Sequence, residues 1–360
     1  MNQTIAESFG APRTTAAPSA DDPRLVTARR IFRGALIFNT ALTLFWVGSM
    51  VTGRGTMFFS NYRPSLQSVI GIIVFAVGFF YITWGLAWWG IKSRLLRRIG
   101  FTEQERRDAF SSRMDRPFDV AALTAKYSER SIRIADMIGR RGRFITLQAP
   151  MCFFLYKRLR ETPDMSFATA FLGDSLFDAV LVGWIFLAVF WHSGFLGATF
   201  YGPQSRIMDG MLARANCLLI TTLWAAFKFI MVPIGGVLAT LYPKNEFAVV
   251  FALIWVSYMM TDACAEIFGS LFGKQNIKVW GVGDVNRKSV VGVVAGFLGA
   301  FIVGLIVVLS QGLGLPWIGL TFTIALAGTL VELYSPRGTD DITMMTTNAL
   351  LCLAFGAWVR

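Results

Sequence analysis

Long apolar runs without charge constrain this chain more than any other feature. The run 290–309, VVGVVAGFLGAFIVGLIVVL, holds no charged residue. A helix of about 20 residues spans the hydrocarbon core of a bilayer. Inside lipid the backbone must satisfy its own polar groups, so only helices and closed barrels can span it. The chain shows no alternating ten-residue pattern typical of a barrel. The runs therefore predict an all-α polytopic membrane protein.

We expect about 8–9 transmembrane helices, because eight such runs occur and a ninth is shorter. The overall composition agrees, since 54% of the 360 residues are hydrophobic and only 16% are charged, against about 25% charge in soluble proteins. The eight predicted spans lie at 32–52, 67–91, 175–200, 215–241, 246–270, 290–311, 316–334 and 343–358.

Composition shifts divide the chain into four predicted regions. The first is a polar tail rich in Ala, Ser, Thr and Pro, which is typical of disorder. A transmembrane hairpin, a basic cytoplasmic or interfacial region and a transmembrane catalytic domain follow, with the polar motifs of the catalytic domain in 261–341. The four predicted regions are 1–28, 29–91, 92–174 and 175–360.

The basic region begins with a segment, 92–143, that holds fourteen Lys or Arg against seven Asp or Glu. Positive loops face the cytoplasm, so this segment and the N-terminus are predicted to be cytoplasmic. Within it, FTEQERRDAF is typical of an amphipathic helix, and Thr102 with Glu105 fits a capping box. We expect contact with anionic headgroups, although a plain solvated loop fits equally well. The net charge of +12 then needs no nucleic acid to explain it.

The short apolar piece 145–156, ITLQAPMCFFLY, leaves the topology open. Twelve residues with a proline are more typical of an interfacial or re-entrant segment than of a full span. The count of spans nevertheless favours a crossing. One more crossing before the later spans places both 261–274 and the basic loop 271–289 in the cytoplasm. The basic KRLR at 157–160 argues against crossing, since it would then face outward.

The first of three unusual polar stretches is TDACAEIFGSLFGK, 261–274, which ends an apolar run. Carboxylates at membrane depth cost about 2.5–3.5 kcal/mol each on insertion scales, and they mark functional sites. Asp262 and Glu266 are four residues apart and share one helix face. Gly269 and Gly273 allow a helix backbone or a phosphate chain to approach closely. Lys274 would add a point charge for phosphate.

The second stretch, NRKSVVGVVAGFLG, starts at Asn286 and precedes a predicted span. Ser289 is a good N-cap, and Gly292 leaves room at the first turn of the helix. A helix N-terminus beside Arg287 and Lys288 is suited to phosphate. A positive-inside anchor with a helix cap explains the same residues equally well.

The third stretch, VELYSPRGTDDITMMTTNALL, contains Glu332 near the end of one span and Asp340 with Asp341 before the next. Arg337 between them would bind phosphate. Carboxylates and phosphate oxygens are the ligands that Mg²⁺ prefers. A single histidine and four well-separated cysteines offer no alternative ligand cluster. If the three stretches meet, they predict positioning and charge neutralisation for phosphoryl or nucleotidyl transfer to a lipid.

Together these motifs resemble CTP-dependent lipid kinases. The order D-x-x-A-E-x-x-G-x-x-x-G-K, then K-S-x-x-G, then V-E-x-x-S-P-R-G-x-D-D is similar to dolichol kinase, phytol kinase and yeast-type diacylglycerol kinase, which are relatives of phosphatidate cytidylyltransferase. The resemblance covers about 246–358. Thr261 stands where many members have Gly or Ser, RRGRFITLQAP lacks the histidine typical of phytol kinases, and Asp341 stands where Asn is common.

The resemblance implies transfer of the γ-phosphate of CTP to a lipid alcohol, with Mg²⁺ or another divalent cation. The alcohol would be a polyprenol, a phytol-like alcohol or diacylglycerol. Two alternatives stay open: a cytidylyltransferase that makes a CDP-lipid, and a non-enzymatic transporter or scaffold. The predicted catalytic residues are Asp262, Glu266 and Lys288. The predicted phosphate-binding residues are Gly269, Gly273, Lys274, Arg287, Ser289, Gly292 and Arg337, and the predicted metal ligands are Asp262, Glu332, Asp340 and Asp341.

Overall fold

The computed structural model describes residues 86–110, 120–161, 206–209, 234–279, 287–335 and 339–359, with isolated positions between 23 and 44. These residues are helical except for one short hairpin and the connecting turns, which confirms the predicted all-α fold. The span 175–200 lies outside the described residues, as do most of the predicted N-terminal tail and most of the spans 32–52, 67–91 and 215–241.

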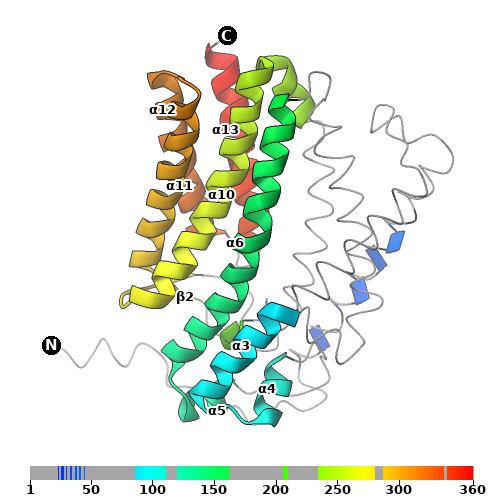
Figure 1. Ribbon diagram of the computed structural model, residues 1–360, viewed down its shortest axis with the longest axis vertical. Coiled ribbons are helices and arrows are strands. Elements are labelled where there is room, and N and C mark those ends of the chain that lie inside the picture. Colours follow the sequence, from blue (N-terminus) through cyan, green and yellow to red (C-terminus); the bar gives the residue numbers. More distant parts are fainter. Residues whose placement is uncertain are drawn as a thin grey trace.

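Four helices in the described part are long and apolar enough to cross a membrane. They pack side by side in one bundle (Figure 1) and match the last four predicted spans. Residues of α10, α12 and α13 form its main apolar core, and Tyr242 joins α13 by donating its hydroxyl proton to the Cys352 carbonyl oxygen at 2.5 Å. The four helices are α10 (Lys244–Phe272), α11 (Val290–Ser310), α12 (Leu315–Tyr334) and α13 (Asp340–Val359).

Small residues allow α10 and α11 to approach closely. A Cβ added to Gly292 would stand 2.7 Å from the Ala265 carbonyl oxygen, and one added to Gly296 would stand 2.8 Å from that of Thr261. Every fourth residue of α11 from 292 to 304 is Gly or Ala and is buried. Backbone contact of this kind is the usual way for helices to associate inside lipid.

A two-stranded antiparallel hairpin, β1 (Asn276–Lys278) and β2 (Arg287–Ser289), joins α10 to α11. In its register Ile277 lies opposite Lys288. Successive side chains of a strand point to opposite faces, so Lys288 is directed away from Arg287. At the end of β2 the Ser289 hydroxyl accepts a hydrogen bond from the Gly292 N–H at 3.0 Å, which confirms the predicted N-cap.

The basic segment is folded, and at its centre is a buried ion pair. Lys92 and Asp136 lie 2.8 Å apart with side chains 0% and 4% exposed. The second Asp136 oxygen accepts the Ile207 N–H at 2.7 Å, which ties a distant short helix to the segment. The elements are α3 (Leu86–Ile99), α4 (Glu103–Phe110), α5 (Val120–Lys126), the long helix α6 (Glu129–Glu161) and the 3₁₀ helix η5 (Ile207–Asp209).

The helix α6 corrects the picture of 145–156 as a short interfacial or re-entrant piece. It runs unbroken through Pro150 for 33 residues, a length of about 50 Å. Its second half lies alongside α10, and its first half joins α3, α4 and α5 beyond one end of the bundle (Figure 1). The apolar piece therefore belongs to the bundle, and the basic segment lies at the same end as the motif 261–274. The basic segment is also not the plain loop that the sequence allowed.

Replacing Gly292 with Ala should destabilise the α10–α11 pair, because the new methyl group meets a backbone oxygen that cannot move alone. We expect a loss of about 1–3 kcal/mol in the free energy of unfolding. Gly319→Ala is the matched control, since nothing lies within 4 Å of a Cβ at that position in α12. It should be neutral or stabilise by up to about 1 kcal/mol. Denaturant unfolding in a mild detergent measures both, and equal effects would contradict the close-packing account.

Glu105 should make the stability of the basic segment depend on acid pH. Partial burial acts to raise its pKa, but hydrogen bonds from Lys126, Thr102 and Tyr127 outweigh it and hold the pKa at about 2. The Thr102 contact is the predicted capping box, with the Thr102 N–H at 2.7 Å from Glu105 Oε2. A depressed pKa stabilises the fold above the ordinary value of about 4.3, and this contribution is lost as the pH falls toward 2.

Glu105→Gln should therefore lose less stability than the wild type between pH 5 and pH 3. Melting temperatures of the two proteins in detergent across this range are the measurement. Curves that fall in parallel would show that Glu105 is not held in its charged form.

Candidate functional site

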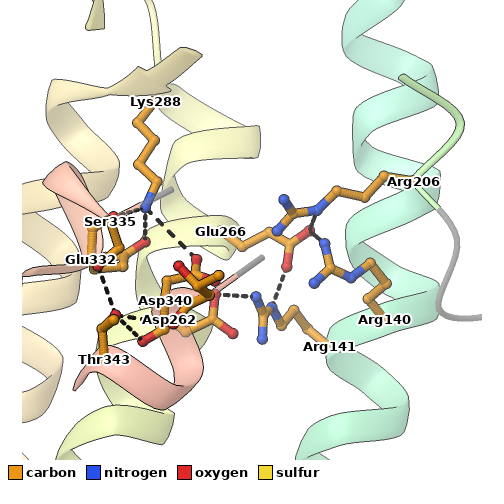
Figure 2. A network of polar contacts seen from close by, with 11 residues as sticks. Arg140, Arg141, Arg206, Asp262, Glu266, Lys288, Glu332, Ser335, Asp340 and Thr343 are labelled. Carbon is orange, nitrogen blue, oxygen red and sulfur yellow. Dashed lines mark hydrogen bonds and ion pairs between the residues drawn. The ribbon is translucent and has the colours of Figure 1, made fainter. Parts of the chain in front are cut away.

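The second and third polar stretches meet at Lys288. Its Nζ lies 2.9 Å from Glu332 Oε1 and 3.9 Å from Asp340 Oδ2 (Figure 2), and it also donates to the Glu332 carbonyl oxygen. The Glu332 side chain is only 6% exposed. A cation beside a carboxylate buried in this way stabilises its charged form. Three elements, β2, α12 and α13, thus converge on one ammonium group.

A turn between α12 and α13 brings Glu332 and Asp340 to the same place. The Ser335 and Thr343 hydroxyl groups lie 2.6 Å apart, and Thr343 also donates to the Asp340 carbonyl oxygen at 3.1 Å. The helix α12 ends where the Ser335 N–H donates to the Val331 carbonyl oxygen at 2.8 Å. These hydroxyl groups fix the spacing of the two carboxylates across the turn.

The carboxylates of the first stretch are paired with arginines that the sequence did not predict. Arg141 Nη2 lies 2.5 Å from Asp262 Oδ1, and its Nε contacts Glu266. Arg140 Nη1 and Arg206 Nε reach the same Glu266 oxygen at 3.0 and 3.2 Å. Figure 2 shows the guanidinium group of Arg141 between the two carboxylates, and those of Arg140 and Arg206 beside Glu266. Arg141 and Glu266 are nearly buried, with side-chain exposures of 4% and 11%, whereas Arg140 and Arg206 are 23% and 25% exposed.

The first turn of α6 binds the other side of the hairpin. Glu129 accepts from Arg133 at 2.9 Å and also pairs with Arg287 of β2. Arg130 donates to the Leu271 carbonyl oxygen near the end of α10 at 2.7 Å. The opposite orientation of Arg287 and Lys288 therefore connects β2 to α6 on one face and to α12 and α13 on the other.

A polar pocket of about 130 Å³ lies between these groups. Ligand pockets commonly measure about 300–1,000 Å³, so this space suits the phosphate part of a nucleotide better than a whole nucleotide. Its polar lining includes four cations. The charged lining residues are Arg133, Arg206, Arg287, Lys288, Asp136, Asp262, Glu266, Glu332 and Asp340, and the small ones include Gly269, Ser270, Ser289 and Gly292.

The glycines of the first stretch have a clear packing role. A Cβ added to Gly269 would stand 2.8 Å from the Ser289 hydroxyl oxygen, and one added to Gly273 would stand 2.4 Å from the Gly269 carbonyl oxygen. Gly273 and the exposed Lys274 do not line the pocket. Phosphate binding by these three residues stays a prediction. Arg337 and the side chain of Asp341 lie outside the described residues.

Two of the four predicted Mg²⁺ ligands already have close cationic partners, and the Mg²⁺ site stays a prediction. Magnesium takes a near-octahedral shell of oxygen ligands, usually one or two carboxylates together with waters and phosphate oxygens. Asp262 is held by Arg141, and Glu332 is held by Lys288. Within the described ranges no group of three or more Asp, Glu, His or Cys side chains is arranged to hold a metal ion. Arginine and lysine supply the positive charge in this arrangement.

Arg140 and Arg141 could have been predicted from the sequence, whereas Arg206 could not. Two carboxylates at membrane depth need cationic partners, and the RRGR at 140–143 directly precedes the apolar piece 145–156. The positive-inside rule explains the same arginines as cytoplasmic charge, so the pairing with carboxylates is not evident from their number alone. Arg206 stands far from any motif in the sequence, and the hydrogen bond from the Ile207 N–H to Asp136 holds the chain where Arg206 meets Glu266.

Comparison of the chain with protein-family models, curated proteins and solved structures finds no match. The resemblance to CTP-dependent lipid kinases thus rests on the motifs themselves.

Removing Lys288 should destabilise the protein more than removing the whole ion pair. Lys288→Met leaves the buried Glu332 carboxylate without its cation, at a cost of about 3–5 kcal/mol. The double change Lys288→Met with Glu332→Gln should recover most of this loss, because no charge is then left buried. Lys278→Met, on the exposed side of the same hairpin, is the control and should change little. The measurement is the free energy of unfolding of each variant in detergent. If the loss in the double variant equalled the sum of the losses in the two single variants, the proposed coupling would be contradicted.

Proposed function

We propose that this chain is a membrane-embedded lipid kinase that transfers the γ-phosphate of CTP to a lipid alcohol. The observation that carries the proposal is the convergence of the three motif stretches on one polar pocket at the end of a bundle of apolar helices. In this proposal the protein has about eight or nine spans in all. The pocket faces the cytoplasm, where the basic segment follows the positive-inside rule.

The charges of the pocket support phosphoryl transfer. This reaction depends on positioning and on stabilising the charge that develops on phosphate oxygens. Four cationic side chains line the pocket beside five carboxylates, and they come from α6, from β2 and from the residue directly before η5. Arginine forks match phosphate oxygens in geometry and remain charged at all relevant pH values.

The location of the pocket supports a lipid acceptor. The helices beside it expose apolar side chains along their outer faces, for example Val294, Leu298 and Ile302 of α11. An acceptor with a long hydrocarbon tail can reach the pocket from the bilayer while its hydroxyl group approaches Lys288 and Asp340. A panel of acceptors can show which lipid alcohol is used: a polyprenol, a phytol-like alcohol or diacylglycerol.

In the proposed reaction the acceptor oxygen forms a bond to the γ-phosphorus, and the bond from that phosphorus to the β-bridging oxygen breaks. CDP leaves with the electron pair of that bond, and the hydroxyl proton passes to a carboxylate. Asp340 is our candidate for this base, because its 3.9 Å separation from Lys288 is looser than the contacts holding Asp262 and Glu332. Lys288 then stabilises the transferred group.

A cytidylyltransferase is the second candidate, because an arginine-rich pocket also suits an acceptor that already carries phosphate. It would join the α-phosphorus of CTP to the lipid phosphate and release pyrophosphate. The two reactions differ in which phosphorus reaches the lipid, so one labelling experiment separates them.

The test uses the purified full chain in nanodiscs, a panel of lipid alcohols and phosphatidate, and CTP labelled at either the α- or the γ-phosphorus, in buffer containing divalent cation. Transfer of γ-label to an alcohol is expected, and ATP in place of CTP tests the donor. Asp340→Asn should lower turnover by roughly 10²–10⁴-fold, as removal of a general base does. Lys278→Gln, outside the pocket on the same hairpin, should retain activity.

Lipid carrying the α-label instead would establish the cytidylyltransferase. No label in any lipid, from a protein with an unchanged melting temperature, would reject both reactions and favour the non-enzymatic alternative.

A further inference from the structure

The exposed face of α3 changes from apolar to cationic along the helix. Ile91 is 39% exposed, and the exposed residues Arg94, Arg97 and Arg98 follow it. Residues three and four positions apart share one face of a helix, so the three guanidinium groups project together. On the opposite face Lys92 is fully buried, and this packing fixes the direction of the exposed face. We call the three arginines the α3 patch.

The α3 patch is not used for contacts within the part of the chain that the structure describes, where none of its guanidinium groups pairs with a carboxylate. Two of them lie in the last turn of α3, where a cation can bind free carbonyl groups. The backbone closes that end instead. The Phe101 N–H donates to the Leu96 carbonyl oxygen at 3.1 Å, and the Gly100 N–H donates to that of Arg97 at 3.0 Å. The charges of the patch are therefore available to an external anion.

Contacts with α6 show where α3 lies relative to the membrane bundle. The Trp88 ring lies against Gly142, and Lys92 pairs with Asp136, so the two helices run antiparallel. Arg141, next to Gly142, pairs with the acidic residues in the last three turns of α10. The helix α3 therefore begins level with the end of the bundle and continues beyond it (Figure 1).

Exposed aromatic side chains indicate the depth of the bilayer surface. Tyr334 is 68% exposed at the pocket end of the bundle, and Trp358 is 79% exposed at the other end. Tyrosine and tryptophan are typical of the two membrane–water interfaces. The part of α3 from Lys92 to Arg98 measures about 9 Å along its axis, which is comparable with a headgroup layer of about 5–8 Å on each side of a bilayer. The patch thus lies at the depth of the headgroups.

We propose that the α3 patch binds the phosphate groups of anionic phospholipids in the leaflet at the pocket end of the bundle. Basic residues beside a membrane span attract anionic headgroups, and guanidinium forks match phosphate oxygens in geometry. This binding is separate from the reaction proposed above and does not depend on it.

The patch differs from the surface that the amphipathic pattern of FTEQERRDAF suggested. The helix α4, which this segment forms, carries three acidic residues against two basic ones. Arg106 and Arg107 both pair with Glu103, and Glu105 pairs with Lys126 of α5. The charges of α4 are thus neutralised within the protein, whereas those of α3 face outward.

Lipid bound at the patch should also steady one wall of the pocket. Lys92 on the inner face of α3 pairs with Asp136, and Asp136 lines the pocket. A ligand that binds the folded state stabilises it by mass action. We therefore expect anionic lipid to raise the melting temperature of the protein.

The test is native mass spectrometry of the full chain in a neutral detergent, titrated with phosphatidylglycerol or phosphatidylcholine. The wild type should bind phosphatidylglycerol more tightly. Arg94→Gln, Arg97→Gln and Arg98→Gln together should raise the dissociation constant for phosphatidylglycerol at least about tenfold and leave that for phosphatidylcholine unchanged. Lysine at the same three positions keeps the charge and should retain most of the preference.

Arg107→Gln is the matched control for the single changes. Arg107 is also an exposed arginine, on the neighbouring helix α4, but it is paired with Glu103. Each single change to Gln in the patch should weaken phosphatidylglycerol binding about threefold or more, and Arg107→Gln should leave it unchanged.

The variants are expected to fold, because the side chains of the patch are exposed. Equal melting temperatures in nanodiscs of phosphatidylcholine alone check this. In nanodiscs that also contain phosphatidylglycerol the wild type should melt at a higher temperature, and the triple Gln variant should gain nothing. If the triple variant is unstable, the single variants measured against Arg107→Gln decide the outcome.

Three results would overturn the proposal. The first is phosphatidylglycerol binding that is unchanged in the triple Gln variant. The second is an equal loss in Arg107→Gln and in the single patch variants, which would show an effect of net charge alone. The third is displacement of phosphatidylglycerol from the wild type by inorganic phosphate, which would make the patch a site for a soluble anion.

Discussion

Arg141 makes the interaction on which the site depends. Its guanidinium group joins Asp262 to Glu266, one helical turn apart, in the last three turns of a helix whose central part is apolar. Two unpaired carboxylates there would carry a heavy desolvation cost. Because the compensating charge comes from α6, the basic segment must dock against the membrane bundle before α10 can bury its acidic end. Folding of the two parts is therefore coupled through one buried group of charges.

The parts of the fold that the sequence predicted well are those governed by local rules. An uncharged run of 20 residues is a helix in lipid whatever surrounds it, so α11 and α12 were found within a residue or two. The Thr102–Glu105 capping box and the Ser289 cap are interactions across three residues, and both occur. The short hairpin before α11 was missed, since its strands have only three residues each.

The candidate site was predicted only in half. Its carboxylates and Lys288 were visible because charge is rare near a span, and the three motif stretches do converge. The arginines were hidden because charge is common in a basic segment, where a functional arginine looks like its neighbours. Pairing across 121 residues, as between Arg141 and Asp262, leaves no local pattern. The role of the glycines was ambiguous for a different reason. Close helix packing and close contact with phosphate both favour a residue that has no side chain.

The register of the hairpin has a consequence for how this chain can vary. Strand alternation sends Arg287 to Glu129 and Lys288 to Glu332, so a single inserted or deleted residue within β2 would exchange the two faces. Guanidinium and ammonium would then each meet the wrong partner, although composition and net charge would hardly change. Related chains should therefore tolerate varied length between the strands far better than a shift within Arg287–Ser289. A frame of three residues thus decides which carboxylate each of the two cations meets.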